Sequence, residues 1–121
     1  RFNRFENNRF EQSRETGVII GAPGEADCSL NIWTGNTFHT NSEEKSGEWP
    51  AIAAFGACDT TFTLNQVFSW DSAVVKHRHS LVLGKGCRNW IVKDNVFRHN
   101  VERAVVYDDK AEHVIKDNLG E

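Results

Sequence analysis

The chain has 121 residues, 39% of them hydrophobic and 26% charged, which is typical of a folded domain or part of one. The net charge is −3 and no block of like charge is long enough to suggest an interaction tail, so a nucleic-acid partner is not expected. The chain has no run of about 18 apolar residues, so the sequence predicts no membrane span. Its odd number of cysteines disfavours a disulfide framework.

A repeat of about 29 residues runs along the chain. An asparagine recurs at intervals of 28, 29, 30 and 23 residues, with one apolar residue three positions before it and another after it. The asparagines are Asn8, Asn36, Asn65, Asn95 and Asn118. The preceding residues are Phe5, Trp33, Phe62, Val92 and Ile115, and the following ones are Phe10, Phe38, Val67, Phe97 and Leu119.

Two further markers share this period. The apolar segments GVIIG, AIAAFG, SLVLG and AVVYDD lie upstream in each unit, and Cys28, Cys58 and Cys87 recur in step, with Ala111 at the corresponding place in the last unit. The apolar segments are short and bounded by Gly, Asn and Asp, which is typical of strands, and no helical periodicity is sustained. The sequence therefore predicts stacked coils of three short strands each, about 4.8 Å apart, with like residues in ladders.

Each ladder has a structural interpretation. We expect the asparagines at a tight turn, where Asn tolerates left-handed backbone angles and its amide can bond to the neighbouring coil. The cysteines are expected to be small buried residues of the interior. A metal shared by three stacked thiols is the alternative, but thiols in a column do not converge tetrahedrally.

At these repeats the sequence resembles the pectate-lyase-like superfamily of single-stranded right-handed parallel β-helices, which includes polysaccharide lyases, glycoside hydrolases and phage tailspikes. The resemblance covers essentially the whole chain as a fold-level repeat. It implies an all-β right-handed parallel β-helix of four to five coils, a polysaccharide or oligosaccharide partner, and an extracellular, periplasmic or virion-surface location. In the lyases of this superfamily a Lys follows one strand and an Arg-His-Gly follows the equivalent strand one coil later. Lys85 in SLVLGKG stands near the first place, but Asp108 and Asp109 stand where the arginine would be.

The first candidate segment is the long loop HTNSEEKSGEWP, residues 39–50. Glu43, Glu44 and Trp49 are predicted to bind substrate, since carboxylates bond sugar hydroxyls and an exposed indole can stack on a pyranose ring. A solvated charged loop is the alternative interpretation.

The second candidate segment is SWDSAVVKHRHS, residues 69–80. Trp70 is a predicted substrate-binding residue. The predicted catalytic residues of this segment are Asp71, Lys76, His77, Arg78 and His79. In an extended chain Lys76 and Arg78 would face one side and the two histidines the other, and so dense a cationic cluster suits an anionic sugar. A solvent-facing turn is the alternative.

The third candidate segment is VVYDD, in which Tyr107, Asp108 and Asp109 end a strand. The two aspartates are predicted catalytic residues, and their carboxylates could also hold Ca²⁺. An ordinary turn is the alternative.

Three functions fit these residues. A glycoside hydrolase would use two of the acids, and a uronate lyase would use Lys76, Arg78 or a histidine. A non-catalytic tailspike or adhesin would use Trp49, Trp70 and the basic cluster to bind glycan, and a structural spacer would need no site. We expect residues 1–121 to form a single β-helix segment of a longer polypeptide, with further coils or a capping element covering both ends.

Overall fold

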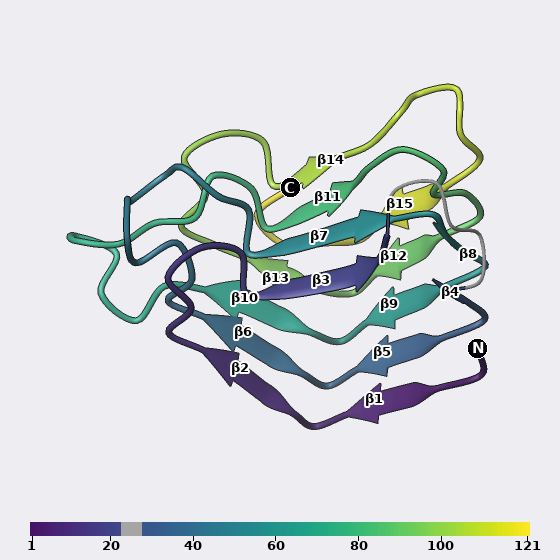
Figure 1. The fold of residues 1–121 in the computed structure, drawn as a ribbon, viewed down its shortest axis with the longest axis horizontal. Coiled ribbons are helices and arrows are strands. Elements are labelled where there is room, and N and C mark those ends of the chain that lie inside the picture. Colours follow the sequence, from purple (N-terminus) through teal and green to yellow (C-terminus); the bar gives the residue numbers. More distant parts are fainter. Residues whose placement is uncertain (23–27) are drawn as a thin grey trace.

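The computed structural model describes residues 1–22 and 28–121, in which all regular elements are strands. Successive coils contribute strands to three parallel sheets (Figure 1). Sheet A contains β1 (Arg4–Glu6), β5 (Ile32–Thr34), β9 (Thr61–Thr63), β12 (Ile91–Lys93) and β15 (Val114–Lys116). Sheet B contains β2 (Arg9–Glu11), β6 (Thr37–His39), β10 (Gln66–Phe68) and β13 (Val96–Phe97). Sheet C contains β3 (Val18–Gly21), β7 (Ile52–Phe55), β11 (Leu81–Leu83) and β14 (Val105–Val106), and β4 (Cys28–Ser29) pairs with β8 (Ala57–Cys58).

The strand register confirms the predicted all-β parallel β-helix and its period of about 29 residues. The column that precedes the asparagines pairs in register from Phe5 through Trp33, Phe62 and Val92 to Ile115. The column that follows them also pairs in register as far as Phe97. Leu119 departs from the expected column, because it pairs with Val96 and not with Phe97.

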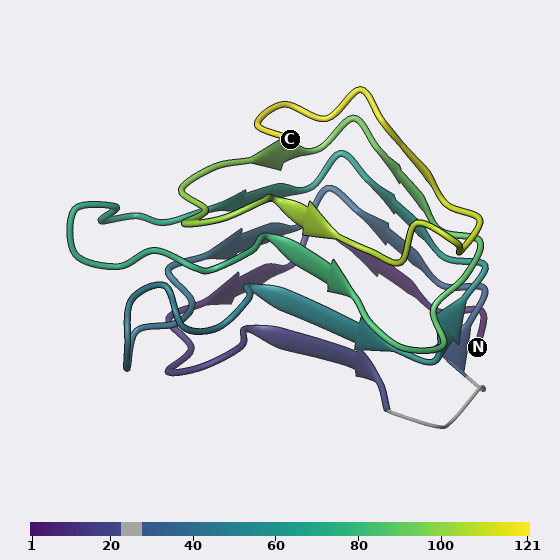
Figure 2. The same ribbon diagram turned by 90° about the horizontal axis from the view of Figure 1, so that it is seen from above.

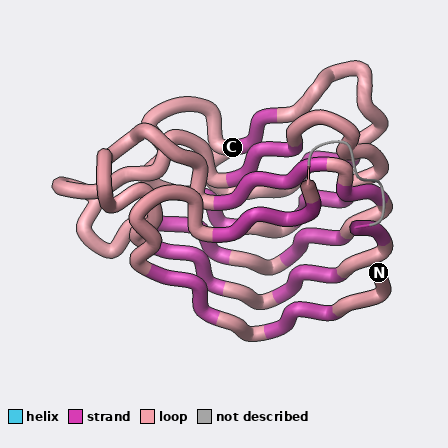
Figure 3. The backbone as a smooth tube through the Cα atoms, in the orientation of Figure 1, coloured by secondary structure: helices cyan, strands magenta, loops and turns pink. Residues whose placement is uncertain are grey.

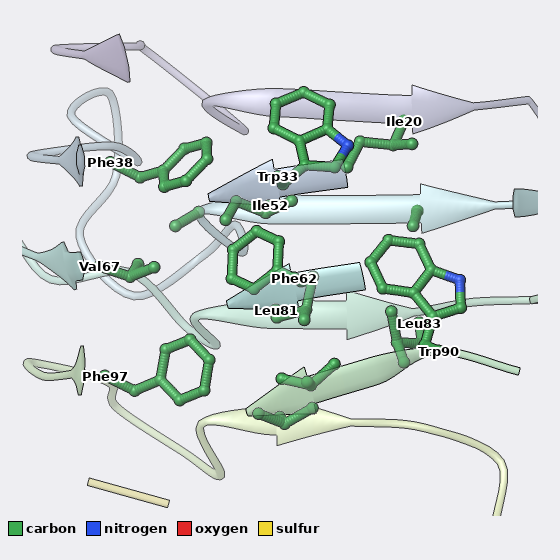
Figure 4. Close-up of a cluster of buried hydrophobic side chains, with 14 of the residues drawn as sticks. Ile20, Trp33, Phe38, Ile52, Phe62, Val67, Leu81, Leu83, Trp90 and Phe97 are labelled. Carbon is green, nitrogen blue, oxygen red and sulfur yellow. The ribbon is translucent and has the colours of Figure 1, made fainter. Parts of the chain in front are cut away.

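Stacked apolar side chains from all three sheets fill the inside of the coils (Figure 4). The rings of Phe5 and Trp33 stack with centroids 4.0 Å apart, and Phe38 and Phe62 follow at 5.9 Å. Trp90 is fully buried, and its indole N–H donates to the Ala57 carbonyl at 2.8 Å. The interior is therefore closed by side chains, so any ligand site must lie on an outer face or in the loops.

The asparagine ladder forms as predicted, but the left-handed residue is elsewhere. The Asn65 side-chain oxygen accepts the Asn36 backbone N–H at 2.9 Å, and the same bond recurs from coil to coil. The positive φ belongs to the residue before each asparagine, such as Leu64 at 56° and Asp94 at 57°. The left-handed residue bends the chain between sheets A and B, and the asparagine after it bonds to the adjacent coil (Figure 1).

The three cysteines do not form the predicted continuous ladder. Cys28 pairs in register with Ala57, whereas Cys58 pairs with Ser29 and Arg88. Cys58 is therefore one position out of the column, and because side chains alternate along a strand it cannot stack on Cys28. Cys58 and Cys87 are nevertheless buried, and Cys28 is half-buried, as expected of small interior residues.

The connections between sheets differ strongly in length. Sheets A and B are joined by turns of two residues, whereas sheets B and C are joined by the longer loops 12–17, 40–51, 69–80 and 98–104. These loops gather at one edge of the molecule (Figure 3), which we call the loop edge, and the loop after β10 projects beyond the others (Figure 2). The described connections that follow sheet C, such as 84–90 and 107–113, lie at the opposite edge (Figure 1).

Candidate functional site

The predicted site residues fall into two groups at opposite ends of the sheet C strands. The loop-edge group contains Glu43, Glu44, Trp49, Trp70, Asp71, Lys76, His77, Arg78 and His79, all before β7 or β11. Asp108 and Asp109 follow β14 at the other end. The structure therefore does not bring Asp71 together with Asp108 or Asp109 as a pair of catalytic acids.

Hydrogen bonds join loops 40–51 and 69–80 side by side at the loop edge. The Gly47 N–H donates to the Lys76 carbonyl at 2.6 Å, and the Lys76 N–H donates to Ser46 Oγ at 2.9 Å. The Arg78 N–H donates to the Trp49 carbonyl at 2.8 Å. The two sequence segments thus form one continuous surface.

The loop 40–51 differs from its prediction in the exposure of Trp49. Glu43 and Glu44 are exposed, and Glu44 pairs with Arg14 at 2.7 Å. Trp49 was expected to be exposed, but it is half-buried and its backbone N–H donates to Ser42 Oγ at 3.2 Å. The loop folds back on itself at Ser42, which removes Trp49 from consideration as a fully open stacking surface.

The side chains of the basic segment, residues 76–79, alternate between exposed and covered positions, as expected of an extended chain. Lys76 and Arg78 are exposed, His77 is fully buried and the His79 side chain is 14% exposed. The Arg78 guanidinium pairs with Glu102 at 3.0 Å, and the second carboxylate oxygen of Glu102 lies 3.6 Å from His79 Nε2. Glu102 therefore offsets part of the positive charge that the sequence places here.

His77 is held in the interior of the loop edge. Its Nε2 lies 2.8 Å from Asn100 Oδ1 and 3.2 Å from Ser80 Oγ. Burial lowers the pKa of His77 from 6.5 to about 4, with the Asn100 hydrogen bond opposing the shift. A neutral imidazole without access to solvent favours a structural role over the proton transfer predicted for it.

Trp70 and Asp71 stand at the base of the projecting loop. The indole of Trp70 is 78% exposed, while its backbone N–H donates to Thr40 Oγ1 at 2.9 Å. The Asp71 carbonyl accepts the N–H groups of Val74 and Val75, and its side chain is exposed. Trp70 is thus an exposed aromatic side chain on an anchored backbone.

The third predicted segment lines an open cleft of about 450 Å³ at the ends of β11 and β14. The lining residues are Val82, Leu83, Gly84, Lys85, Gly86, Cys87, Val106, Tyr107 and Asp108. Residues that carry an ammonium, a phenol and a carboxylate therefore line one concavity. Asp108 also accepts the Lys110 N–H at 3.0 Å, as an aspartate at a turn does, whereas Asp109 does not line the cleft.

A second cleft of about 460 Å³ borders the same segment and is lined in part by Trp90, Glu112 and His113. The Tyr107 ring meets the His113 ring edge-on at 6.0 Å, and the Arg103 guanidinium lies 4.7 Å from the Tyr107 ring centroid. Burial lowers the pKa of His113 and the nearby Asp108 carboxylate opposes that shift. Tyr107 is therefore fixed between a cation and an imidazole.

Sequence reasoning missed two arrangements. Lys85 and Asp108 converge because Val82 and Val106 pair in register, and that register was available from the repeat. His39 was assigned to a loop, but it ends β6 and stacks on Phe68 at 5.3 Å beside Glu11. Its partners come from three coils, so only the full strand register could have revealed them.

Within residues 1–22 and 28–121 no group of three or more His, Cys, Asp or Glu side chains is placed to hold a metal ion. No helix with the length and apolar character needed to cross a membrane occurs in that same part of the chain.

Comparison with known proteins assigns the fold to a family. The family model for the right handed beta helix region matches residues 2–119, so the chain belongs to the right-handed β-helix family. No curated protein and no solved structure matches the chain significantly.

Proposed function

We propose that the chain binds an acidic polysaccharide across the outer face of sheet C and cleaves it in the Lys85–Asp108 cleft. The observation that supports the proposal is that Lys85, Tyr107 and Asp108 line the same open cleft of about 450 Å³. Clefts with a few convergent polar groups on an otherwise apolar lining are typical ligand sites. A chain leaving this cleft across sheet C would meet the basic segment Lys76–His79 at the loop edge.

The residues favour elimination over hydrolysis. Glycoside hydrolases commonly use two carboxylates on either side of the bond, whereas Asp108 is the single carboxylate among the described residues that line the cleft. A lyase instead needs a cation to neutralise the uronate carboxylate and a base for the adjacent carbon-bound proton. The cleft supplies both.

The proposed step assigns one role to each side chain. Lys85 neutralises the uronate carboxylate, and Asp108 takes the proton from the neighbouring carbon. The electron pair of that C–H bond forms a carbon–carbon double bond as the bond to the glycosidic oxygen breaks. The Tyr107 hydroxyl donates its proton to the departing oxygen, which leaves as a sugar hydroxyl.

The first experiment is a screen of acidic and neutral polysaccharides with two simultaneous readouts. Unsaturated product, followed by its ultraviolet absorbance, would support the lyase. Reducing ends without unsaturated product would support a hydrolase and contradict the assigned step. Glycan binding without either product would leave a non-catalytic recognition role, which the exposed indole of Trp70 favours as the second candidate.

Matched variants test the cleft itself. Asp108→Asn keeps an acceptor for the Lys110 N–H but removes the charge, so activity should fall by at least about a hundredfold while the fold is retained. Asp109→Asn is the control, because Asp109 is exposed and does not line the cleft. Equal losses in the two variants would rule out the assignment of Asp108.

The location follows from the same proposal. Acidic polysaccharides are components of cell surfaces and extracellular matrices, so we propose an extracellular, periplasmic or virion-surface setting. Fractionation of cells that express the natural protein, with detection by antibody, would test this.

A further inference from the structure

A second cluster of polar and aromatic side chains lies on the outer face of sheet B. Glu11, His39 and Phe68 pair in register across β2, β6 and β10. They alternate with the inward column that contains Phe10 and Phe38, so their side chains leave the opposite face. These residues have no part in the cleft function proposed above.

His39 is almost completely covered although it stands on this outer face. It is 3% exposed, and its ring stacks on Phe68 at 5.3 Å with an interplanar angle of 16°. On the other side, Nε2 lies 2.8 Å from Glu11 Oε2. The Trp70 ring covers it further, with its centroid 6.3 Å away.

The Nε2-protonated tautomer of His39 connects these groups. With the proton on Nε2, His39 donates to Glu11, and Nδ1 accepts the Thr40 hydroxyl at 3.0 Å. Thr40 Oγ1 in turn accepts the Trp70 backbone N–H at 2.9 Å. The Arg9 Nε–H also points at Nε2 from 3.0 Å and donates to it in the other tautomer, in which Nδ1 donates to the Thr40 hydroxyl. Arg9 Nη2 pairs with Glu11 Oε2 at 2.9 Å in both tautomers. Trp70 and Glu11 are thus connected through an ordered chain of hydrogen bonds.

The exposed parts of this cluster present complementary chemistry. The indole of Trp70 is 78% exposed, and the side chains of Arg9 and Glu11 are 62% and 41% exposed. Arg9 and His39 both occupy Glu11 Oε2, and Oε1 has no hydrogen-bond partner within the described part of the chain. Glu11 Oε1 can therefore accept a hydrogen bond from a ligand hydroxyl close to the exposed ring of Trp70.

We propose that Trp70, Glu11 and Arg9 form a binding site for a neutral pyranoside unit. The indole stacks on the apolar C–H face of the sugar, Glu11 Oε1 accepts one hydroxyl, and the Arg9 guanidinium donates to another. Glu11 Oε1 is a negatively charged acceptor, so it accepts a hydrogen bond from a sugar hydroxyl but repels the carboxylate of a uronate at the same place. His39 is a positioning residue, because it orients the Glu11 carboxylate.

The test uses cellohexaose as the neutral probe and oligogalacturonate as the charged comparison. Binding is followed by the NMR shift of the Trp70 indole N–H and by titration calorimetry. Trp70→Ala and Glu11→Gln should each weaken cellohexaose binding by about tenfold or more. Loss of binding in both variants supports the site.

Two matched controls exist in the chain. Glu6 stands in β1 within the same Arg-Phe-Glu sequence as Glu11 and pairs with Arg4, but it belongs to sheet A, so Glu6→Gln should leave cellohexaose affinity unchanged. Val74 is 67% exposed in the same loop as Trp70, and Val74→Ala should also have no effect. A loss in either control equal to that in the test variants would overturn the site.

The positioning role has its own readout. His39→Gln retains an N–H donor for Glu11 and should bind cellohexaose within about threefold of the native protein, whereas His39→Leu should lose about tenfold while remaining folded. Equal affinities in these two variants would overturn the role of His39. Failure to bind cellohexaose, or binding of oligogalacturonate at Trp70 instead, would overturn the site. Neither result depends on product formation in the Lys85–Asp108 cleft, so the two proposals fail separately.

Discussion

Asn65 illustrates how one residue connects three coils. Its side-chain oxygen accepts the backbone N–H and the side-chain N–H of Asn36, and its own amide donates to the Trp33 carbonyl at 3.0 Å and to Asn95. All of these groups are buried, and Asn65 is 0% exposed. Because a buried polar group that loses its partner bears its full desolvation cost, the ladder is highly sensitive to substitution.

Replacement of this central asparagine should be much more costly than replacement at the start of the ladder. We expect Asn65→Ala to lower the free energy of unfolding by about 3 kcal/mol or more, since it leaves the Asn36 N–H and the Trp33 carbonyl unpaired. Asn8→Ala should cost about 1 kcal/mol, because the Asn8 side chain is exposed and only donates to Asn36. Urea denaturation measures both, and equal costs would contradict the ladder as a source of stability.

His77 should make the fold sensitive to acid. Burial holds its folded-state pKa at about 4, below the ordinary value of 6.5, so the unfolded chain binds a proton more readily than the folded one. The stability is complete above pH 6.5, declines as the pH falls towards about 4, and loses about 3 kcal/mol from this group over that window. Denaturation curves at several pH values should show a weaker decline in His77→Gln, which keeps a donor for Asn100. An unchanged slope in that variant would contradict the assignment.

At the residue scale, the role of each ladder asparagine was predictable from the sequence, but the position of the left-handed backbone angle was not. The asparagine amides were predicted to bond between coils, and they do. The left-handed angle was placed on the same residue, whereas the preceding position carries it, because Leu64 gives no sign in its side chain of a positive φ. The exposure of Trp49 was mispredicted because it depends on contacts within the loop.

At the scale of elements, the turn between sheets A and B is the most regular part of each coil. The left-handed position holds Asn7, Gly35, Leu64, Asp94 and Asp117 in successive turns. Gly, Asn and Asp adopt this conformation readily, whereas Leu adopts it only with steric strain. Leu64 is 64% exposed, so little burial compensates for the strain.

This turn offers a stabilising substitution. Leu64→Asn should raise the free energy of unfolding by about 0.5–1 kcal/mol, because it relieves the left-handed strain at φ 56° without loss of buried area. Gln66→Asn, at an exposed and extended position of β10, is the control and should not stabilise the fold. A higher urea midpoint in the first variant alone would confirm the expectation, and no change would contradict it.

The strands were predictable from the sequence because their register repeats, while the loops were not. The stacking of Phe5, Trp33 and Phe62 follows from a constant interval to the asparagine. The loop edge has no such interval, so the bonds between loops 40–51 and 69–80 could not be derived. The candidate cleft lies between these cases. Tyr107 and Asp108 were singled out from the sequence, and the register of Val82 with Val106, which follows from the repeat, places them near Lys85.

At the scale of the whole molecule, each coil contacts only its neighbours, so stability should vary along the axis. Phe62 is 0% exposed and lies between Trp33 and Val92. Phe5 in the first coil is half-buried, and within the described residues it pairs on one side only. We expect Phe62→Ala to cost about 3–5 kcal/mol and Phe5→Ala clearly less. Hydrogen exchange should show the same gradient, with β9 more protected than β1. Uniform protection would contradict nearest-neighbour stability.

The edge strands bear on the proposal that further coils or a cap cover both ends. β1 and β15 are the outer strands of sheet A, and each has a neighbour on one side only within the described structure. Light scattering on residues 1–121 tests this: we expect association, since unpaired edges are templates for strand addition. A stable monomer would contradict it.

The constant two-residue turn makes each coil an interchangeable module. A tandem duplication from Asn36 to Leu64 would add 65 − 36 = 29 residues, one full turn of the helix, and displace everything after it by about 4.8 Å along the axis. Every later strand would then meet a neighbour of the same kind as before. Such a chain can lengthen by unequal recombination without redesign of its interior, while the loop edge is free to acquire insertions. Growth and specialisation are thereby assigned to different parts of the same coil.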